Sequence, residues 1–555
     1  MKRSPLLAIL IAVSAPGVRA ELPGGALRTP PLPVIGSETV VGTGLLVARP
    51  ATPSCTVELF AMREFQGEAR APIDFAPPAD CPAPWSKVVL EADFHVTAGE
   101  QFDRTAFINL AGVNLLTGTT MEPGRKRAPQ WHVEQDVTDY TALFKDRRAG
   151  EALLTNYVDG RYTGRLFLGA RLVFYSASAD FPAAKTPDLV LALADKPTQL
   201  TAEQPEVARS ITFPRNVERL AIDVMAEPQA DDEFWYFCPP DRVTERPKQG
   251  GQPPCGAPFR ETEIRIDGVL AGFAPAYPWI YTGGVNPRMW VLAPGVEALN
   301  LQPYRVDLTP FAGLINDGKT HRIALHVTGV HRYFNVMGTL MAWLDPARTV
   351  VSGALTLNRL TSAEQRISGR MRLVGEDDVV GRAIVTTRRD ESVAGYVQTS
   401  RGRIETRVLY DWRFANRQHG SQGGRLHIDQ SATVRTDTRT QGPDGSRHRT
   451  LTEHFPLVID IHERPAGQDK VSDMHFRQGL HRSESERHGR WTRKRVTRLS
   501  VEPRVHMVIP PSGRRDAKGS ATTVSRTVIR DTLAGCHDRT VTVSDGRIAA
   551  IADGC

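Results

Sequence analysis

The sequence predicts an all-β fold: two tandem jelly-roll or β-sandwich domains, followed by a C-terminal β-rich accessory domain. Three observations lead to this prediction. Apolar and polar residues alternate at period two over short segments, sustained helical periodicity is scarce, and turn-forming residues recur roughly every 8–12 positions. Short alternating strands at such spacing are typical of sandwiches and jelly rolls.

The order of these segments predicts the first two domains. Residues 21–37 are rich in Pro and Gly and indicate a tail, and strands follow from about Glu38. Residues 176–204 contain Ala-Lys-Thr-Pro and Asp-Lys-Pro-Thr, which favour a connection. Because 555 residues are too many for one core, we expect a first domain at 38–196 and a second at 205–345.

The composition changes after about residue 346. Arg, Thr, Ser and His become more frequent, and long polar strands are predicted near 402–410 and 426–434. We interpret 346–555 as a separate accessory domain that ends in a small disulfide-closed tail.

The first twenty residues are typical of a secretory leader. Lys2 and Arg3 precede an apolar run at 6–13, and Val18-Arg19-Ala20 offers a cleavage site after Ala20. The run is too short to span a bilayer, and no later stretch approaches twenty apolar residues. We expect removal of 1–20 and a secreted or periplasmic protein without a membrane span.

The six cysteines form three sequence-local pairs. An even number of cysteines in an exported protein predicts disulfides, and short loops close at a lower entropic cost than long ones. The sequence has no CxxC pattern that would predict a zinc site, and full pairing would leave no thiol nucleophile. The expected disulfides are Cys55–Cys81, Cys238–Cys255 and Cys536–Cys555.

Charge and motifs exclude several classes of function. The formal net charge of +7 is spread along the chain, so no nucleic-acid partner is implied. HExxH, GxSxG and Rossmann motifs are absent. The C-terminal histidines are spread over predicted strands and are interpreted as polar-face residues. We therefore expect no metal and no other cofactor, and a monomer.

A series of short motifs keeps its order and spacing over about residues 38–330. The series comprises Gln101-Phe-Asp103-Arg104, Gly112-Val-Asn-Leu-Leu116, Glu122-Pro123, Trp131-His-Val-Glu-Gln-Asp136, Asn156-Tyr-Val-Asp159, Asp231-Asp-Glu233-Phe-Trp235-Tyr236, Phe259-Arg260-Glu261 and Tyr281-Thr-Gly-Gly284-Val-Asn286-Pro287 with Trp290. Together these motifs resemble the acidic peptide:N-glycanase family of plants and bacteria, the PNGase A family, and we expect a bacterial member. The segment after 346 resembles the family's tail less clearly.

The resemblance implies an amidase that acts on N-glycosylated peptides or glycoproteins. It would hydrolyse the amide between asparagine and the first N-acetylglucosamine, giving an aspartate and a glycosylamine. The bacterial F type of peptide:N-glycanase has its active site between two jelly rolls, and Phe102-Asp103-Arg104 is similar to its Trp-Asp-Arg motif. A second acid of that type corresponds to Asp159. Its third acid lies between close cysteines and has no counterpart here, so Glu233 or Glu261 is expected in that role.

The chemistry of amide hydrolysis agrees with these candidates. Without a metal, serine or thiol, the reaction needs an activated water, a stabilised oxyanion and a proton for the departing nitrogen. Carboxyl groups whose pKa values differ can activate the water and supply the proton to the departing nitrogen. Aromatic rings offer apolar faces on which sugars can pack. The catalytic candidates are Asp103, Glu233, Glu261 and Asp159. The substrate-binding candidates are Arg104, Trp235, Asp232, Asn156, Arg288 and Trp290.

Each candidate also has a structural alternative. Asp103 fits a strand-end carboxylate, Asn156 and Asp159 fit a turn, and Glu261 fits a surface charge. The acidic-aromatic segment at 231–236 fits a solvated loop over a core Trp, and Trp290 fits a core position. Two other functions stay open: a non-catalytic carbohydrate-binding or adhesion protein on the same fold, and a glycoside hydrolase or lyase.

Overall fold

The computed structural model describes residues 25–42, 46–67, 69–247, 253–374, 378–513 and 516–555, so the predicted leader at 1–20 lies outside the described residues. The described chain is built almost entirely from strands, and the all-β prediction is confirmed. Its helices are short: α1 (Ala312–Ile315) and the 3₁₀ helices η1 (Thr138–Lys145), η2 (Ala230–Phe237), η3 (Asp241–Val243), η4 (Pro287–Met289) and η5 (Thr309–Phe311). Within these described ranges, no helix is long and apolar enough to cross a membrane.

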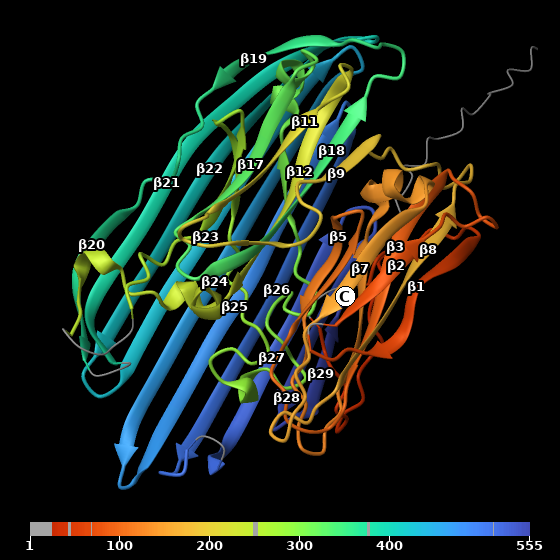
Figure 1. The fold of residues 1–555 in the computed structure, drawn as a ribbon. Helices are drawn as coiled ribbons and strands as arrows, with labels where there is room; N and C mark the ends of the chain where they lie inside the picture. The colour runs from red at the N-terminus through yellow and green to blue at the C-terminus, as the bar shows by residue number, and fades with distance from the viewer. Residues whose placement is uncertain (1–24, 43–45, 68, 248–252, 375–377, 514–515) are drawn as a thin grey trace, which may run out of the picture.

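The first β unit consists of two four-stranded sheets, drawn in red and orange in Figure 1. One sheet has the order β1 (Ser54–Glu64), β8 (Leu166–Ser176), β3 (Trp85–Val96), β6 (Gln130–Asp136), and the other β2 (Arg70–Phe75), β7 (Arg148–Leu154), β4 (Thr105–Leu110), β5 (Val113–Thr119). Alternation in the sequence becomes alternation in burial, as every second residue of β2 is buried. Phe75 of β2 stacks on Phe174 of β8 with ring centroids 6.2 Å apart, which joins the two sheets through the core.

The second β unit also contains two sheets. The first has the order β10 (Thr198–Leu200), β18 (Tyr333–Leu344), β12 (Val217–Gln229), β16 (Tyr304–Asp307), with β9 (Leu189–Ala192) also paired to β18, and the second has the order β11 (Glu206–Thr212), β17 (Thr320–Thr328), β14 (Glu261–Ile266), β15 (Val269–Pro275). The sheets approach closely, since a Cβ added to Gly338 of β18 would lie 2.9 Å from Leu325 Cδ1 of β17. Strand β9 falls within the range expected for the first domain but pairs in this second unit.

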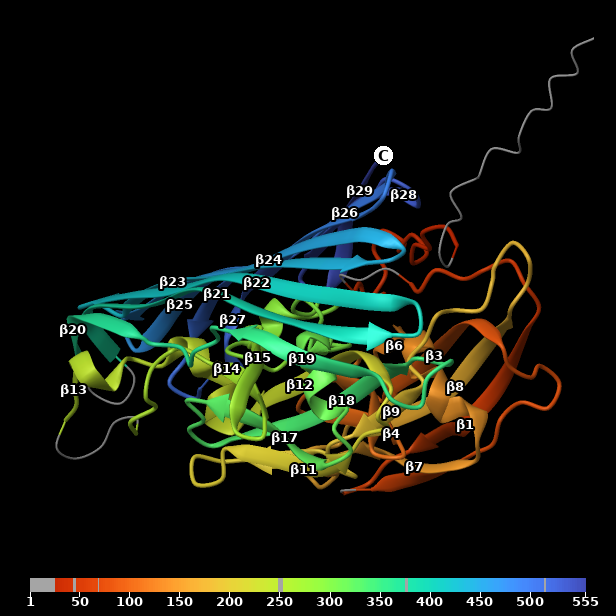
Figure 2. The same cartoon turned by 90° about the horizontal axis from the view of Figure 1, so that it is seen from above.

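The chain from Ser352 onward, joined by the two-residue strand β13 (Thr244–Glu245) of the second unit, forms one large sheet whose longest strands have 22 residues. Its other members are β19 (Ser352–Asn358), β20 (Arg366–Val374), β21 (Asp378–Thr399), β22 (Gly402–Ser421), β23 (Arg425–Gly442), β24 (Gly445–Ala466), β25 (Asp469–His488), β26 (Trp491–Ile509), β27 (Lys518–Asp531), β28 (Gly535–Ser544) and β29 (Arg547–Gly554). Figure 2 shows this long sheet as a layer over the second unit. The buried face of the layer shares one hydrophobic core with that unit, where Trp412 of β22 lies 6.4 Å from Phe273 of β15 between ring centroids.

The cysteines pair as the sequence predicts. Cys55–Cys81 links the start of β1 to the loop before β3, Cys238–Cys255 closes the loop after η2, and Cys536–Cys555 joins β28 to the C-terminus. No free thiol is left among the six. None of the six cysteines is therefore available as a thiol nucleophile.

Candidate functional site

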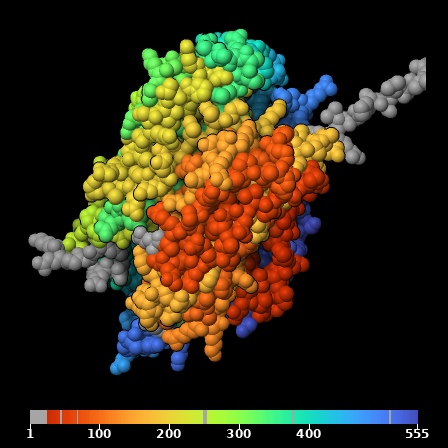
Figure 3. Space-filling model, turned by 45° about the vertical axis from the view of Figure 1, so that its right-hand side comes forward, coloured from red at the N-terminus to blue at the C-terminus, as the bar shows by residue number. Residues whose placement is uncertain are grey.

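Three carboxyl side chains are near enough to influence one another across the boundary between the first and second β units. Figure 3 shows these two units against each other, in red-orange and in yellow. Asp103 and Glu122 belong to the first unit and Glu233 to the second. Each influences its neighbours electrostatically: the charge of Asp103 acts on both glutamates, and that of Glu122 acts on Glu233. Like charges this close cannot all be ionised at low cost.

Two paired strand ends hold Asp103 and Glu122 side by side. Asp103 lies just before β4 and Glu122 just after β5, and these two strands are hydrogen-bonded neighbours. The Arg104 N–H donates to Thr120 Oγ1 and the Thr120 N–H donates to the Arg104 carbonyl, both at 2.9 Å. The ladder therefore continues past the strands and fixes the backbone on which both acids stand.

A glycine from the second unit completes the contact. Thr282 Oγ1 donates to the Thr120 carbonyl at 2.6 Å, which brings the next residue, Gly283, against the two acids. A Cβ added to Gly283 would lie 2.6 Å from Asp103 Oδ1 and 2.6 Å from Glu122 Oε1. Only glycine lets the backbone approach this closely, and the Gly283 N–H donates to the Asp103 carboxylate.

Strand β12 and the 3₁₀ helix η2 deliver Glu233 to the same place. The buried Glu227 of β12 accepts a hydrogen bond from Thr105 Oγ1 of β4 at 2.7 Å, which ties the two units together beside the cluster. Gln229 Nε2 also donates to Thr105 Oγ1, at 3.2 Å. Since η2 starts directly after β12, this link sets the position of Glu233.

Burial makes all three acids harder to ionise than free carboxyl groups, and the two glutamates are also affected by the charge of Asp103. Burial first, and then the charge of Asp103, raise the pKa of Glu122 to about 8 and that of Glu233 to about 8. Burial also raises the pKa of Asp103, but the Gly283 N–H, its own N–H and the Arg104 charge lower it. No such lowering partner acts on Glu233. The arrangement can thus hold a carboxylate at Asp103 beside a protonated Glu233.

Arg104 and two exposed aromatic rings form the rim of this cluster. Arg104 donates from Nη2 to Gln101 Oε1 at 2.9 Å, and its guanidinium lies 5.8 Å from the ring centroids of both Phe102 and Tyr157. These two rings are 48% and 49% exposed, which is unusual for large apolar groups. An arginine between exposed aromatic rings suits a ligand that has both apolar faces and hydroxyl groups.

Asn156 lies beneath this rim and is fully buried. Its Oδ1 accepts from Gln101 Nε2 at 3.0 Å and its Nδ2 donates to the Phe65 carbonyl at 2.6 Å. Asn156 therefore fixes Gln101, and through it Arg104, and it has no exposed atoms to offer a ligand.

Asp159 and Glu261 lie outside the cluster. Asp159 is exposed, and its Oδ1 accepts from the backbone N–H groups of Arg161 and Tyr162, both at 2.7 Å, which closes a turn. Glu261 is completely buried and forms an ion pair with Arg389 of the long sheet. Burial, together with the charges of the nearby acids Glu263 and Glu391, raises its pKa to about 7.

The four remaining candidates are wholly or partly buried, and three of them form hydrogen bonds to neighbouring segments of the protein. Asp232 is buried and accepts from Arg260 and from the N–H groups of His331 and Arg332. Trp235 lies in the core with 2% of its surface exposed. Trp290 is fully buried, and its Nε1 donates to the Gly284 carbonyl at 2.8 Å, which holds the turn that carries Gly283. Arg288 is half-buried and donates to the Ala517 carbonyl at 2.7 Å.

Sequence reasoning did not select Glu122 and Gly283 as site residues. Both lie inside motifs that carry the family resemblance, but neither motif gives a chemical reason to prefer them. The only signal for Glu122 was its position. In a hairpin, a residue just after the second strand lies beside a residue just before the first strand, which places Glu122 beside Asp103.

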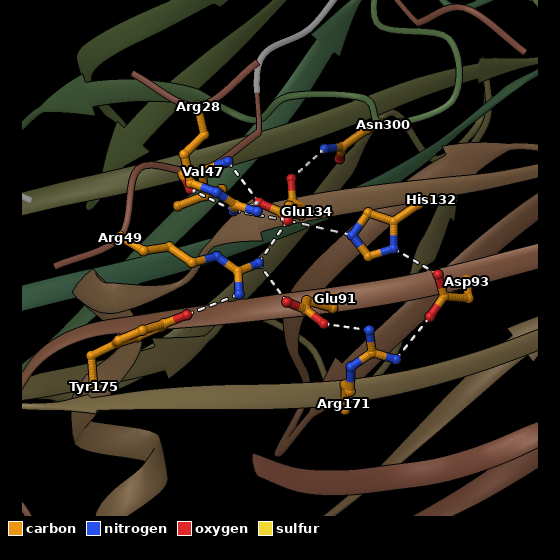
Figure 4. Close-up of polar contacts among 10 residues, drawn as sticks. All are labelled: Arg28, Val47, Arg49, Glu91, Asp93, His132, Glu134, Arg171, Tyr175 and Asn300. Carbon is orange, nitrogen blue, oxygen red and sulfur yellow. Dashed lines mark hydrogen bonds and ion pairs between the residues drawn. The ribbon is translucent and has the colours of Figure 1, made fainter. Parts of the chain in front are cut away.

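A second group of charged residues anchors the N-terminal segment to the first unit (Figure 4). Glu134 of β6 accepts from the Val47 N–H at 2.7 Å and from Arg49 at 2.6 Å, while Arg28 donates to it at 3.0 Å. His132 lies between Asp93 and Glu134, at 2.6 Å and 3.4 Å. These bonds raise the pKa of His132 to about 9 and lower that of Glu134 to about 2 despite its burial.

This charged group is interpreted as an anchor and not as a metal site. Glu91, His132 and Glu134 could each offer one ligand atom. However, a protonated imidazole has no free lone pair, and both glutamates already form ion pairs with arginines: Glu91 with Arg49 and Arg171, and Glu134 with Arg49 and Arg28. The other possible set, Cys55, Asp80 and Cys81, uses sulfur atoms that are joined in a disulfide.

The anchor is expected to stabilise the fold most strongly between about pH 4.5 and 6.5. Glu134, with its lowered pKa, contributes fully above its unfolded value of 4.5 and loses the contribution toward pH 2. His132, with its raised pKa, contributes fully below 6.5 and loses the contribution toward pH 9. The difference in Tm between wild type and His132→Gln should be largest between about pH 4.5 and 6.5 and should vanish above about pH 9. A difference that is constant with pH would contradict the assignment.

Comparisons with known proteins place these observations in context. The family described as peptide N-acetyl-β-D-glucosaminyl asparaginase amidase A matches residues 50–363. The peptide-N4-(N-acetyl-β-glucosaminyl)asparagine amidase A of Prunus dulcis is 29% identical over 437 residues, which cover 74% of this chain and 75% of that protein.

Solved structures also show likeness. PNGF-II has a TM-score of 0.36 and 11% identity, over 52% of this chain and 66% of that one. PNGase F, a glycosylasparaginase from Flavobacterium meningosepticum, has a TM-score of 0.35 and 11% identity, over 53% of this chain and 96% of that one.

Proposed function

We propose that this chain, which belongs to the peptide N-acetyl-β-D-glucosaminyl asparaginase amidase A family, removes N-glycans from asparagine in glycopeptides or glycoproteins. Membership of the family makes it an amidase, a hydrolase of the carboxamide bond. The observation that carries the proposal is the buried cluster of Asp103, Glu122 and Glu233 between the two units, in which three partners favour the ionised form of Asp103 and only influences that raise the pKa act on Glu233.

The cluster can supply both proton transfers of the reaction. The Asp103 carboxylate takes a proton from a water molecule whose oxygen forms a bond to the carboxamide carbon of the substrate asparagine. Glu233, which holds its proton up to about pH 8, gives that proton to the departing nitrogen as the carbon–nitrogen bond breaks. The products are an aspartate side chain and a glycosylamine.

Neighbouring groups position the substrate for this step. Arg104 is a fixed cation next to Asp103 and suits the developing oxyanion or a sugar hydroxyl. The exposed rings of Phe102 and Tyr157 offer apolar faces to the sugar. We place the enzyme outside the cytoplasm, secreted or periplasmic, because its three disulfides are expected to persist only in an oxidising compartment.

Incubation with a defined N-glycopeptide tests the proposal. The amidase converts the glycosylated asparagine to a bare aspartate, which mass spectrometry distinguishes from asparagine. Cleavage between sugars would instead leave N-acetylglucosamine on the peptide and would identify a glycoside hydrolase or lyase. Binding without any mass change would identify a non-catalytic carbohydrate-binding protein.

A further inference from the structure

A pocket of about 410 Å³ opens beside Glu122, on the side where the long sheet meets the first two units. Glu122 and Arg127 of the first unit and Arg288 of the second form one wall. The opposite wall comes from the far end of the chain: Ala521 of β27, and Asp545 with Gly546 in the turn between β28 and β29. The volume lies in the range of small-molecule sites.

The wall from the long sheet is held firmly in place. Arg288 Nη2 donates to the Ala517 carbonyl at 2.7 Å, and Thr523 Oγ1 donates to the Met289 carbonyl at 2.6 Å. Beneath the pocket, the loop after Trp290 packs against β28 and β29 in a small hydrophobic cluster. Its buried members are Leu292, Ala293, Val541, Val543 and Ile548. The pocket is therefore preformed, and the sheet is one of its permanent sides.

The charged side chains that line this pocket suggest what it accepts. Arg127 and Arg288 bring N–H donors, and Glu122 and Asp545 bring carboxyl oxygens. Arg127 also forms an ion pair with Glu38, at 3.8 Å between Nε and Oε2. A lining of donors and acceptors suits a ligand that both donates and accepts, as a hydroxyl group does.

The charge balance and the backbone favour a sugar over an ion or a peptide. The charges of Arg127 and Arg288 are balanced by Asp545 of the lining and by Glu38, the ion-pair partner of Arg127. Burial raises the pKa of Glu122 to about 8 and keeps this group protonated up to about that pH, so a neutral ligand is suited best. The backbone of the wall is already paired, because the Asp545 N–H donates to the Ala521 carbonyl at 2.9 Å. It therefore offers no open strand edge to which a peptide could add.

We propose that this pocket is a saccharide subsite, which receives a sugar of the N-glycan beyond the one joined to asparagine. The long C-terminal sheet thus completes the substrate site as well as the hydrophobic core. The inference rests on the proposed function, because it takes Glu122 as part of the catalytic cluster.

A pair of neighbouring residues on β27 gives a matched test. Ala521 lines the pocket, whereas Thr522 lines a groove on the outer face of the sheet. We compare kcat/KM for two glycopeptides that share one peptide and carry either a single N-acetylglucosamine or the complete glycan. The Ala521→Trp side chain should fill the pocket and exclude the sugar, which then loses its hydrogen bonds to the charged lining. The ratio of kcat/KM for the complete glycan to kcat/KM for the single sugar should therefore fall by about 10- to 100-fold. Thr522→Trp should keep the wild-type ratio.

Arg127→Met provides a second variant in case the bulky tryptophan prevents folding, and it should lower the same ratio. An unchanged ratio of kcat/KM in both pocket variants would overturn the subsite. If the loss of kcat/KM instead depended on the length of the peptide in the substrate, the pocket would bind the peptide and the subsite would also be overturned. If the wild type cleaves neither substrate, the proposed function fails, and calorimetric titration with the free oligosaccharide decides the subsite. Weaker binding by both pocket variants than by Thr522→Trp then supports it, and equal binding overturns it.

Discussion

Asp103→Asn is expected to lower kcat/KM for glycopeptide hydrolysis by about 10²- to 10⁴-fold, the usual contribution of a positioned acid–base group. The amide keeps the shape of the carboxylate but cannot accept the proton of the attacking water. Asp103 is the acid of the cluster with the most partners that favour ionisation, namely two backbone N–H groups and Arg104. Steady-state kinetics on one defined glycopeptide measures the loss.

The stability of this variant separates a catalytic role from a structural one. Burial raises the pKa of Asp103, so its ionised form is disfavoured by the fold. Above that pKa the charge costs stability, and Asp103→Asn should be at least as stable as wild type at neutral pH. Asp159→Asn is the matched control, since Asp159 is exposed and its Oδ1 only caps a turn, a role that an asparagine can keep. Equal losses of activity in the two variants would contradict the site.

The general architecture could be predicted from the sequence because it depends on local patterns. Period-two alternation in segments such as β2 and β22 determines which face of a sheet is buried. The position of the third region could not be predicted in this way. Polar and apolar residues alternate along its strands, as in any strand with one buried face. This alternation does not reveal which part of the protein covers the apolar face. Only the structure shows that Trp412 packs against Phe273 and that the second unit and the long sheet share one core.

The site could be predicted only where one motif carried several signals. Asp103 was selected because Phe102-Asp103-Arg104 resembles a motif of the F type of peptide:N-glycanase, and Glu233 because it could replace a missing acid of that type and lies beside aromatic residues. Glu261 looked equally suitable, but its partner Arg389 is more than a hundred residues away and turns it into half of a buried ion pair. Glu122 had no chemical neighbour in the sequence. Its place in the cluster depends on the pairing of β4 with β5, which a predicted hairpin could have indicated, and on the approach of Gly283, which is a tertiary fact.

Glu233→Gln is expected to lower kcat by about 10²- to 10⁴-fold and to remove the alkaline limb of the pH profile. In the wild type, activity should fall above about pH 8, since burial and the charges of Asp103, Glu227 and Glu122 raise the pKa of Glu233 to about 8 and the ionised form cannot donate a proton. The remaining activity of Glu233→Gln no longer depends on the ionisation of this carboxyl group, so it should not fall above about pH 8. Asp231→Asn, an exposed neighbour on the same 3₁₀ helix, should keep both the rate and the limb.

Glu122→Gln tests whether the acids act as one electrostatic unit. Glu122 is one of the charges that raise the pKa of Glu233, so its removal makes ionisation of Glu233 easier. The alkaline limb should therefore move to lower pH in Glu122→Gln, while it disappears in Glu233→Gln. Because coupled groups titrate together, the limb reports the pair and not either residue alone. A limb that stays in place in both variants would show that the proton donor is a different group, and Glu233 would lose its role.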